Sequence, residues 1–352
     1  MHTLKPINQV KYFDQQLFEA TYRKKIVEEY PNRAPETPLV SVCVQTYQHH
    51  KYIAQCLQSI VDQVTDFAYE IIVGDDESSD GTREICLEFA RKYPEKIRLM
   101  LHHRVNNIII NGAFTGRYNL IHNYFHARGK YIAWCEGDDY WTDPLKLQKQ
   151  IRLHEQYPDC VASIHNAFVD DEQNGRSLFY EWNKEKKVDP EFLLVEAIAG
   201  FPTAAVVFNK IIAPIPECLF QIRSADVGIS FLLLNVGSFY YLPDNMCVYR
   251  IHSGGIYSAS RENALKLNKY EQENILFGQC ISSIAKPKVI ALLQKMQLKS
   301  CEKMLYRAFS LKNREAFIDA AQFYAHQFPW WKHPKKFLYL IKTKLKFQLN
   351  KN

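Results

Sequence analysis

Between residues 39 and 158 the sequence alternates short apolar runs with segments of helical periodicity, and no other feature constrains the fold as strongly. Apolar runs rich in β-branched residues, typical of buried strands, lie at 39–44, 70–73, 97–101 and 130–135. Helical patterns follow these runs, as in 50–63, where apolar residues recur every three to four positions. The alternation predicts parallel β-α-β units with right-handed crossovers, and hence an α/β fold with a mostly parallel sheet flanked by helices.

Polar residues follow each predicted strand directly. The four groups are Thr46-Tyr47, Asp75-Asp76, Arg104 and the acidic stretch 136–139. Because the carboxyl ends of parallel strands share one edge of a sheet, we expect these groups to converge there, where open α/β sheets bind ligands.

Three carboxylates, Glu136, Asp138 and Asp139, lie within four positions after the apolar run 131–134. Carboxylates packed this closely repel one another unless a cation lies between them. Mg²⁺ and Mn²⁺ prefer oxygen ligands, so Asp138 and Asp139 are the candidate ligands, with Glu136 assisting through water. The alternative is a loop of solvated acids, and for the nearby Asp143 we favour a helix N-cap.

A second acidic cluster, Asp75-Asp76, follows the strand at 70–73. A carboxylate there can accept hydrogen bonds from a base N–H or a ribose hydroxyl, although part of the cluster must shape the turn into the next helix. Arg117, like Arg104, suits phosphate oxygens, with an ordinary surface arginine as the alternative. Arg250 and His252, two apart on an extended segment and followed by two glycines, are suited to gripping a diphosphate.

Composition narrows the class of protein. The 352 residues are 47% hydrophobic, which indicates a well-packed globular protein, and the nine cysteines are scattered without a C-x-x-C pair, which favours reduced thiols. No apolar run approaches transmembrane length and the amino terminus lacks a signal pattern, so we expect a cytoplasmic protein. The net charge of +6 lies in the tail, since residues 326–352 carry seven lysines and no acid. This distribution argues against a nucleic-acid binder.

Three regions are expected. A helical extension occupies 1–37, with a helix near 15–30; the α/β domain covers 38–258, and a helical region with a basic, aromatic tail covers 259–352. Within the tail, residues 330–352 interleave aromatic residues with lysines. Either they form a packed helix with a solvated basic side, or they dock on an anionic membrane surface. Liposome cosedimentation of a chain lacking 326–352 distinguishes the two.

Four stretches together resemble the bacterial family 2 glycosyltransferases of the GT-A (Rossmann-like) fold. They are 40–47, the Val-Gly-Asp-Asp-Glu-Ser-Ser-Asp-Gly-Thr segment, Glu-Gly-Asp-Asp-Tyr-Trp and Tyr-Arg-Ile-His, in the family's order and over about 38–258. The resemblance implies a nucleotide-diphospho-sugar donor, a divalent cation (Mn²⁺ or Mg²⁺) and inversion at the anomeric carbon.

The resemblance also implies roles for individual residues. Thr46 and Tyr47 would line the nucleotide pocket, and Asp76, with Asp75 beside it, would contact the base. Asp138 and Asp139 match the metal-binding region, where Glu136 replaces the usual first aspartate. Arg117, Arg250 and His252 match basic positions near the donor phosphates. Asp226, at a predicted helix start, matches the catalytic base, which we favour over the alternative of a helix N-cap.

The expected function is therefore transfer of a sugar from a UDP-linked donor to a hydroxyl of a glycan or lipid-linked acceptor, in cell-surface polysaccharide assembly. The expected location is the cytoplasm, with peripheral contact at the inner face of the membrane. Two alternatives remain open. A nucleotidyltransferase would also use paired acids and metal, but the segment 45–51 lacks the Gly-rich phosphate loop expected of one. A non-catalytic sugar-nucleotide-binding protein would tolerate loss of the acids.

Overall fold

The computed structural model describes residues 10–110, 112–193, 201–211, 214–222, 225–255 and 263–327. The chain divides into two compact units. One comprises residues 6–252, and the other comprises residues 253–352 together with the first five residues. The basic, aromatic tail expected at 330–352 lies outside the described residues.

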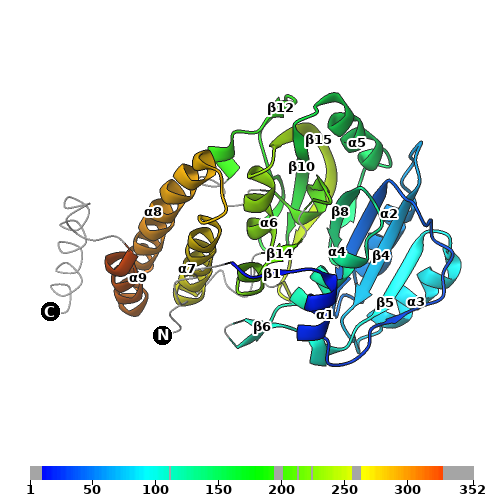
Figure 1. Cartoon of the computed structure of the whole chain (residues 1–352), viewed down its shortest axis with the longest axis horizontal. Helices are drawn as coiled ribbons and strands as arrows, with labels where there is room; N and C mark the ends of the chain where they lie inside the picture. The colour runs from blue at the N-terminus through cyan, green and yellow to red at the C-terminus, as the bar shows by residue number, and fades with distance from the viewer. Residues whose placement is uncertain are drawn as a thin grey trace. The chain divides into compact units, whose positions relative to one another are not determined.

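The larger unit is built on an 11-stranded mixed sheet (Figure 1). Four parallel strands form its centre in the order β8 (Tyr131–Glu136), β3 (Val40–Thr46), β4 (Tyr69–Asp75), β5 (Ile97–Leu101). Beyond β8, the short β13 (Val207–Asn209) runs antiparallel to both β8 and β10 (Cys160–Asp171), and β10 pairs in parallel with β15 (Ser238–Ile251). The remaining strands of this sheet are β2 (Glu28–Glu29), β9 (Tyr140–Trp141), β11 (Gly175–Leu178) and β12 (Lys186–Lys187). The predicted α/β fold with a mostly parallel central sheet is confirmed.

Helices cover both faces of this sheet, because the central strands are apolar on both sides. On one face lie α2 (Ile53–Val61), α3 (Thr82–Lys92) and α5 (Lys146–Gln156), whose apolar residues share a buried cluster with alternate residues of β3, β4 and β8. Against the other side of β3 and β4 lies α4 (Arg117–His126), with α1 (Gln15–Tyr22) packed on it. The helix α6 (Ala225–Leu234) packs against β10 and β15.

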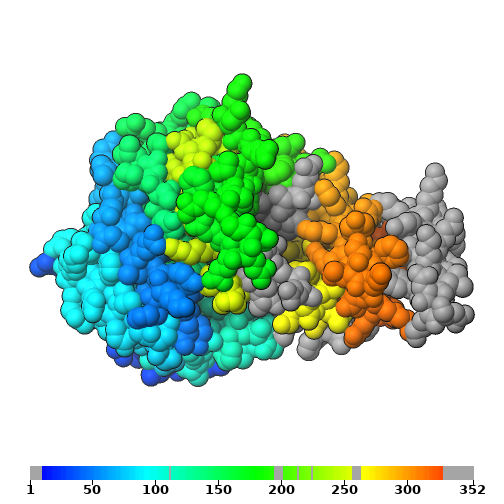
Figure 2. Space-filling model, turned by 180° about the vertical axis from the view of Figure 1, so that it is seen from behind, coloured from blue at the N-terminus to red at the C-terminus, as the bar shows by residue number. Residues whose placement is uncertain are grey.

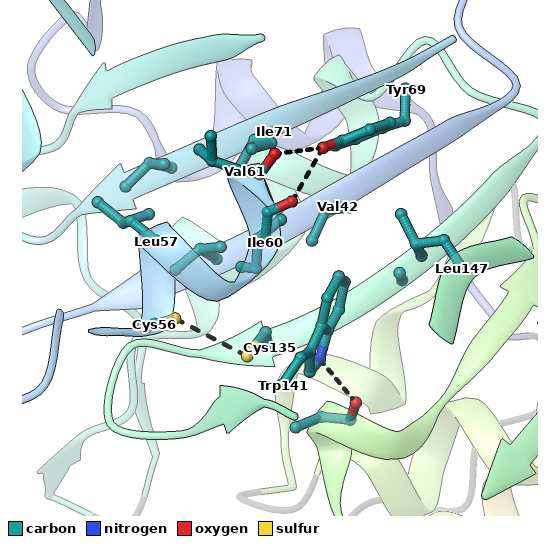
Figure 3. Close-up of a cluster of buried hydrophobic side chains, with 14 of the residues drawn as sticks. Val42, Cys56, Leu57, Ile60, Val61, Tyr69, Ile71, Cys135, Trp141 and Leu147 are labelled. Atoms are coloured by element: carbon teal, nitrogen blue, oxygen red, sulfur yellow. Dashed lines mark hydrogen bonds between the residues drawn. The ribbon is translucent and has the colours of Figure 1, made fainter. Parts of the chain in front are cut away.

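Two buried polar groups of this core, the hydroxyl of Tyr69 and the indole of Trp141, are hydrogen-bonded to backbone carbonyls (Figure 3). The Tyr69 hydroxyl donates to the carbonyl of Ile60 at 2.9 Å, which ties the last turn of α2 to β4. The indole Nε1 of Trp141 donates to the carbonyl of Ala204 at 3.0 Å and so fixes the segment after the acidic loop. All nine cysteines are buried and unpaired by disulfides, as expected of reduced thiols.

The sequence-based helix near 15–30 is wrong in its second half. The helix α1 ends at Tyr22, and Glu28–Glu29 instead pairs antiparallel with β5. The backbone N–H groups of Lys24 and Lys25 both donate to Asn106 Oδ1 at 2.8 Å, an interaction with a distant loop that helical periodicity does not reveal.

Two further small pairings complete this unit: β1 (Tyr12–Phe13) with β14 (Ile215–Pro216), and the hairpin β6 (Ile109–Ile110) with β7 (Ala113–Phe114). Short 3₁₀ turns cover Arg104–Asn106, Thr203–Ala205 and Glu217–Phe220.

The second unit is helical. Its described elements are α7 (Ala264–Ile281), α8 (Pro287–Ser310) and α9 (Arg314–Gln327), which pack on one another around an apolar cluster that includes Ile275, Cys301, Met304 and Phe317. No helix in the described part of the chain is both long and apolar enough to cross a bilayer.

Candidate functional site

The polar groups that follow β3, β4, β5 and β8 lie at one edge of the parallel sheet, because these strands run side by side in the same direction. Glu136 ends β8 and the loop after it carries Asp138 and Asp139, while the end of β15 and the residue after it bring Arg250 and His252 beside this loop. Residues separated by more than a hundred positions thus meet in one site.

Asp138 is the centre of this site. Its Oδ2 accepts a hydrogen bond from Nε2 of His252 at 3.1 Å, and Nε2 of His49 lies 3.8 Å from the same oxygen. Burial opposes the charged carboxylate, but the hydrogen bond from His252 and the two imidazoles outweigh it and lower the pKa of Asp138. The hydrogen bond to Asp138 in turn raises the pKa of His252.

Glu136 lies in the same electrostatic field. Burial, followed by the charges of Asp138 and Asp226, raises its pKa to about 8, and Arg117 offsets part of this rise. Burial likewise raises the pKa of Asp226, with Arg117 acting in the opposite direction. Glu136, Asp226 and Arg117 therefore interact, although they come from β8, α6 and α4.

Asp139 has a different environment. Its side chain is only 1% exposed, Oδ1 accepts the backbone N–H of Arg250 at 2.8 Å, and Oδ2 is buried without a hydrogen-bond partner in the described structure. Burial, followed by the charge of Asp138, raises the pKa of Asp139 well above its usual range. Asp139 therefore connects the end of β15 to the loop after β8. Asp138 has different neighbours, because its Oδ2 faces the imidazoles of His252 and His49.

Asp75, the last residue of β4, and Asp76, which follows it, also have different partners. Asp75 is fully buried, and its Oδ2 pairs with Nε of Arg83 at 2.5 Å and accepts the backbone N–H of Ser78 at 3.2 Å. Consecutive residues of a strand point to opposite faces, so Asp75 turns into the structure while Asp76 turns to the loop of Arg104. The expectation that Asp75 lies beside the nucleotide pocket is not supported by this placement.

Asp76 is held by two donors on one oxygen. Nη1 of Arg104 and Nδ2 of Asn107 both donate to Oδ2 at 2.9 Å. Burial raises the pKa of Asp76 and Arg104 partly offsets this. The Arg104 guanidinium also lies 3.9 Å from the ring centroid of Tyr47 and 4.7 Å from that of Phe114, so two half-exposed aromatic rings border Asp76.

The other predicted residues lie as follows. Thr46 is buried, and its Oγ1 is 3.2 Å from Nδ1 of His49. Arg117 is buried and donates from Nη2 to the carbonyl of Ile222 at 2.9 Å. Nη2 of Arg250 donates to the Gln55 side chain at 2.5 Å.

Sequence reasoning missed His49, Gln55 and Asn107. His49 had one available signal, its position in the loop after β3, but no motif marked it. The other two reach the site only through tertiary packing. Asp143, expected as a helix N-cap, accepts the N–H of Leu145 at 2.8 Å, and α5 starts one residue later.

A cavity of about 300 Å³ lies next to His252, lined by Tyr52, Arg250 and charged residues at the end of β10 and start of β11. Figure 2 shows that blue, green and yellow segments of the larger unit adjoin one another on the face drawn there. His252, which lines the cavity, hydrogen-bonds to Asp138. The cavity therefore opens beside the Asp138–His252 pair.

Two donors of the kind that divalent cations bind lie together in this site. Asp138 supplies a carboxylate oxygen, and His252 supplies an imidazole nitrogen 3.1 Å from Asp138 Oδ2. Burial, followed by the charge of Asp138, raises the pKa of Glu136, and a cation bound nearby would favour its charged form.

Comparisons with known proteins agree on the fold. A model of glycosyl transferase family 2 matches residues 41–214. An uncharacterized protein of Mycobacterium tuberculosis is 32% identical over 229 residues, which cover 63% of this chain and 61% of that protein. The Bacillus subtilis protein TuaG, whose name assigns it to teichuronic acid biosynthesis, is 33% identical over 116 residues, covering 33% of this chain and 42% of TuaG.

Among solved structures, S. aureus TarS in complex with UDP-GlcNAc matches with a TM-score of 0.58 at 18% identity, covering 81% of this chain and 80% of that one. The chain spans about three fifths of the length of the curated relatives it first matches. The matched segment contains the central sheet and the acidic loop, and the fold is that of its structural neighbours. Residues 41–214 are therefore a glycosyl transferase family 2 domain, and the fold is the GT-A fold of its structural neighbours.

Proposed function

We propose that this chain is an inverting glycosyltransferase that moves a sugar from a UDP-linked donor to a hydroxyl of a glycan or lipid-linked acceptor. The observation that carries the proposal is that Asp76 and Asp138 lie at one edge of the sheet in the family 2 segment, where His252 contacts Asp138 and Asp226 interacts with Glu136. The TarS structure that shares this fold contains UDP-GlcNAc, which supports a uridine nucleotide as donor.

The nucleotide base would bind between Tyr47 and Asp76. Tyr47 offers an aromatic face that is 39% exposed, and the carboxylate of Asp76 is the acceptor for a base N–H. Arg104 and Asn107 hold that carboxylate from one side, which fixes its orientation before the ligand arrives.

Asp138, Glu136 and His252 would hold a divalent cation, Mn²⁺ or Mg²⁺, which when bound offsets the negative charge that develops on the diphosphate leaving group. Arg250 borders the same loop and supplies a permanent positive charge, since a guanidinium stays protonated. Asp139 orients Arg250 by accepting its backbone N–H at 2.8 Å, and we assign it this positioning role in preference to direct ligation.

Asp226 would act as the general base that takes the proton of the acceptor hydroxyl. Burial raises the pKa of Asp226, and a raised pKa strengthens a carboxylate as a base near neutral pH. Arg117 keeps the carboxylate available by favouring its charged form. The name of TuaG, which assigns that protein to teichuronic acid biosynthesis, supports a glycan acceptor and a role in cell-surface polysaccharide assembly.

A panel of sugar nucleotides tests the proposal. The purified chain is incubated with UDP-, GDP- and dTDP-sugars with Mn²⁺ or with EDTA, and nucleotide release is measured. We expect release from a UDP-sugar only with the metal, and loss of that release in Asp226→Asn and Asp138→Asn. Asp159→Asn is a matched control, because Asp159 is an exposed acid paired with Lys187. No metal-dependent release from any donor would instead favour a sugar-nucleotide-binding protein.

A further inference from the structure

A second cluster of ligand-type side chains lies outside the site described above, between α1 and α4. Glu19 on α1 faces His122 and His126, which are one turn apart on α4, and one ligand atom of each lies within 4.8 Å of the other two. Nε2 of His126 is 3.7 Å from Oε1 of Glu19. Figure 1 shows α1 beside α4, and the two helices are in contact.

The hydrogen bonds of His126 identify its free nitrogen. Nδ1 lies 2.9 Å from the backbone carbonyl of His122, and a carbonyl can only accept, so Nδ1 carries the proton. In the neutral ring this leaves Nε2 with its lone pair, directed toward the amide of Gln15 at 3.2 Å. An imidazole whose far nitrogen donates to a backbone carbonyl is oriented as metal-binding histidines commonly are.

His122 provides an independent observation. Its side chain is 5% exposed, and Nδ1 is buried without a hydrogen-bond partner in the described structure. The ring stacks on His126, with 3.9 Å between centroids, and meets the edge of His102 at 4.8 Å.

Glu19 completes the donor set. Arg23 binds its Oε2 at 2.6 Å, while Oε1 accepts only a 3.1 Å contact from the flexible Gln15 amide and faces His126. Two imidazole nitrogens and one carboxylate oxygen suit Zn²⁺ and related borderline cations, whereas Mg²⁺ prefers oxygen ligands alone.

We propose that Glu19, His122 and His126 form a zinc-type metal site that fastens α1 to α4. Glu19 precedes the family 2 segment, which starts at residue 41, so the site joins the N-terminal extension to the conserved fold. The helix that it clamps begins at Arg117, the residue that acts on Glu136 and Asp226. The site therefore steadies the element that presents Arg117.

Zinc binding to the EDTA-stripped full-length chain tests the proposal. All zinc titrations use the Asp138→Asn variant as background, because this substitution weakens metal binding at the proposed site around Asp138. Mg²⁺ is kept in excess. Competition with a chromophoric chelator gives the affinity, and zinc X-ray absorption reports imidazole ligands. We expect one zinc per chain with imidazole scattering, and a loss of affinity of roughly 100-fold in Glu19→Gln and in His126→Gln.

The control is His326→Gln, an exposed histidine at the end of α9, which should leave zinc binding unchanged. Circular dichroism of each variant establishes that it is folded, and Glu19, at a partly exposed position, is the substitution least able to disturb packing. Equal zinc affinity in Glu19→Gln, His126→Gln and the control, or a spectrum without imidazole, would overturn the proposal. Neither result bears on donor turnover, which the Asp138 site governs.

Discussion

Replacing Glu136 by glutamine should change how the stability of the chain depends on pH. Burial and the charges of Asp138 and Asp226 raise the pKa of Glu136 from 4.5 to about 8. Between these values the folded chain keeps a proton that the unfolded chain has released. Stability in the metal-free state therefore falls as the pH rises through this window, and the glutamine variant lacks that loss.

The size of the effect follows from the same two values. A pKa difference of one unit is worth about 1.4 kcal/mol, so the whole rise corresponds to at most about 5 kcal/mol. The Glu136 side chain is partly exposed, and water and local relaxation screen it. We therefore expect the free energy of unfolding of Glu136→Gln, relative to that of the wild type, to increase by about 2 kcal/mol between about pH 5 and about pH 8.5.

Urea unfolding followed by tryptophan fluorescence measures this difference. Wild type and Glu136→Gln are compared with EDTA present at both pH values, and Glu88→Gln serves as the control because Glu88 is an exposed acid on α3. Adding Mn²⁺ should remove most of the wild-type pH dependence, since the cation favours the charged carboxylate. Parallel stability curves for wild type and Glu136→Gln across this range would refute the electrostatic reasoning.

Three further predictions concern other parts of the structure. Gly74→Ala should unfold or strongly destabilise the chain in thermal melts, by about 3 kcal/mol or more, because an added Cβ would lie 1.9 Å from Asn119 Oδ1; unchanged melting would contradict this packing. Lys146→Met should stabilise the chain more at about pH 6 than at about pH 9, because burial lowers the pKa of Lys146 to about 7, and a pH-independent effect in urea titrations would count against it. Asp76→Asn should raise the KM for the nucleotide donor roughly tenfold or more with little change in metal affinity, and equal losses of both would show that Asp76 and Arg104 do not form a separate base site.

Much of the fold was predictable because its central strands are continuous apolar runs. Such runs can be buried only in a two-sided parallel sheet, so their ends had to meet at one edge. Prediction failed where distant contacts decide the outcome. The predicted helix near 15–30 stops at Tyr22, and the pairing of β15 with β10 shifts register around Asn166 and Asn245.

In the site, the sequence located the acidic loops but not the orientation of neighbouring acids. Asp75 and Asp76 are adjacent and chemically identical, yet Asp75 pairs with Arg83 in the interior while Asp76 meets Arg104 at the sheet edge. Asp138 and Asp139 differ in the same way, since Asp139 accepts the backbone N–H of Arg250. Which member of such a pair faces the ligand depends on strand pleat and on partners more than a hundred residues away.

The central claim is that Asp138, on the open side of the acidic loop, governs metal-dependent turnover of a nucleotide-sugar. The most direct test is the rate of UDP release from the preferred UDP-sugar at increasing Mn²⁺, in wild type, Asp138→Asn and Asp139→Asn. We predict that Asp138→Asn lowers the rate by roughly 100-fold or more at every Mn²⁺ concentration. We predict that Asp139→Asn lowers the stability of the chain, but that the folded variant releases UDP with the Mn²⁺ dependence of the wild type. Loss of Mn²⁺ dependence in Asp139→Asn, with full activity in Asp138→Asn, would contradict the account.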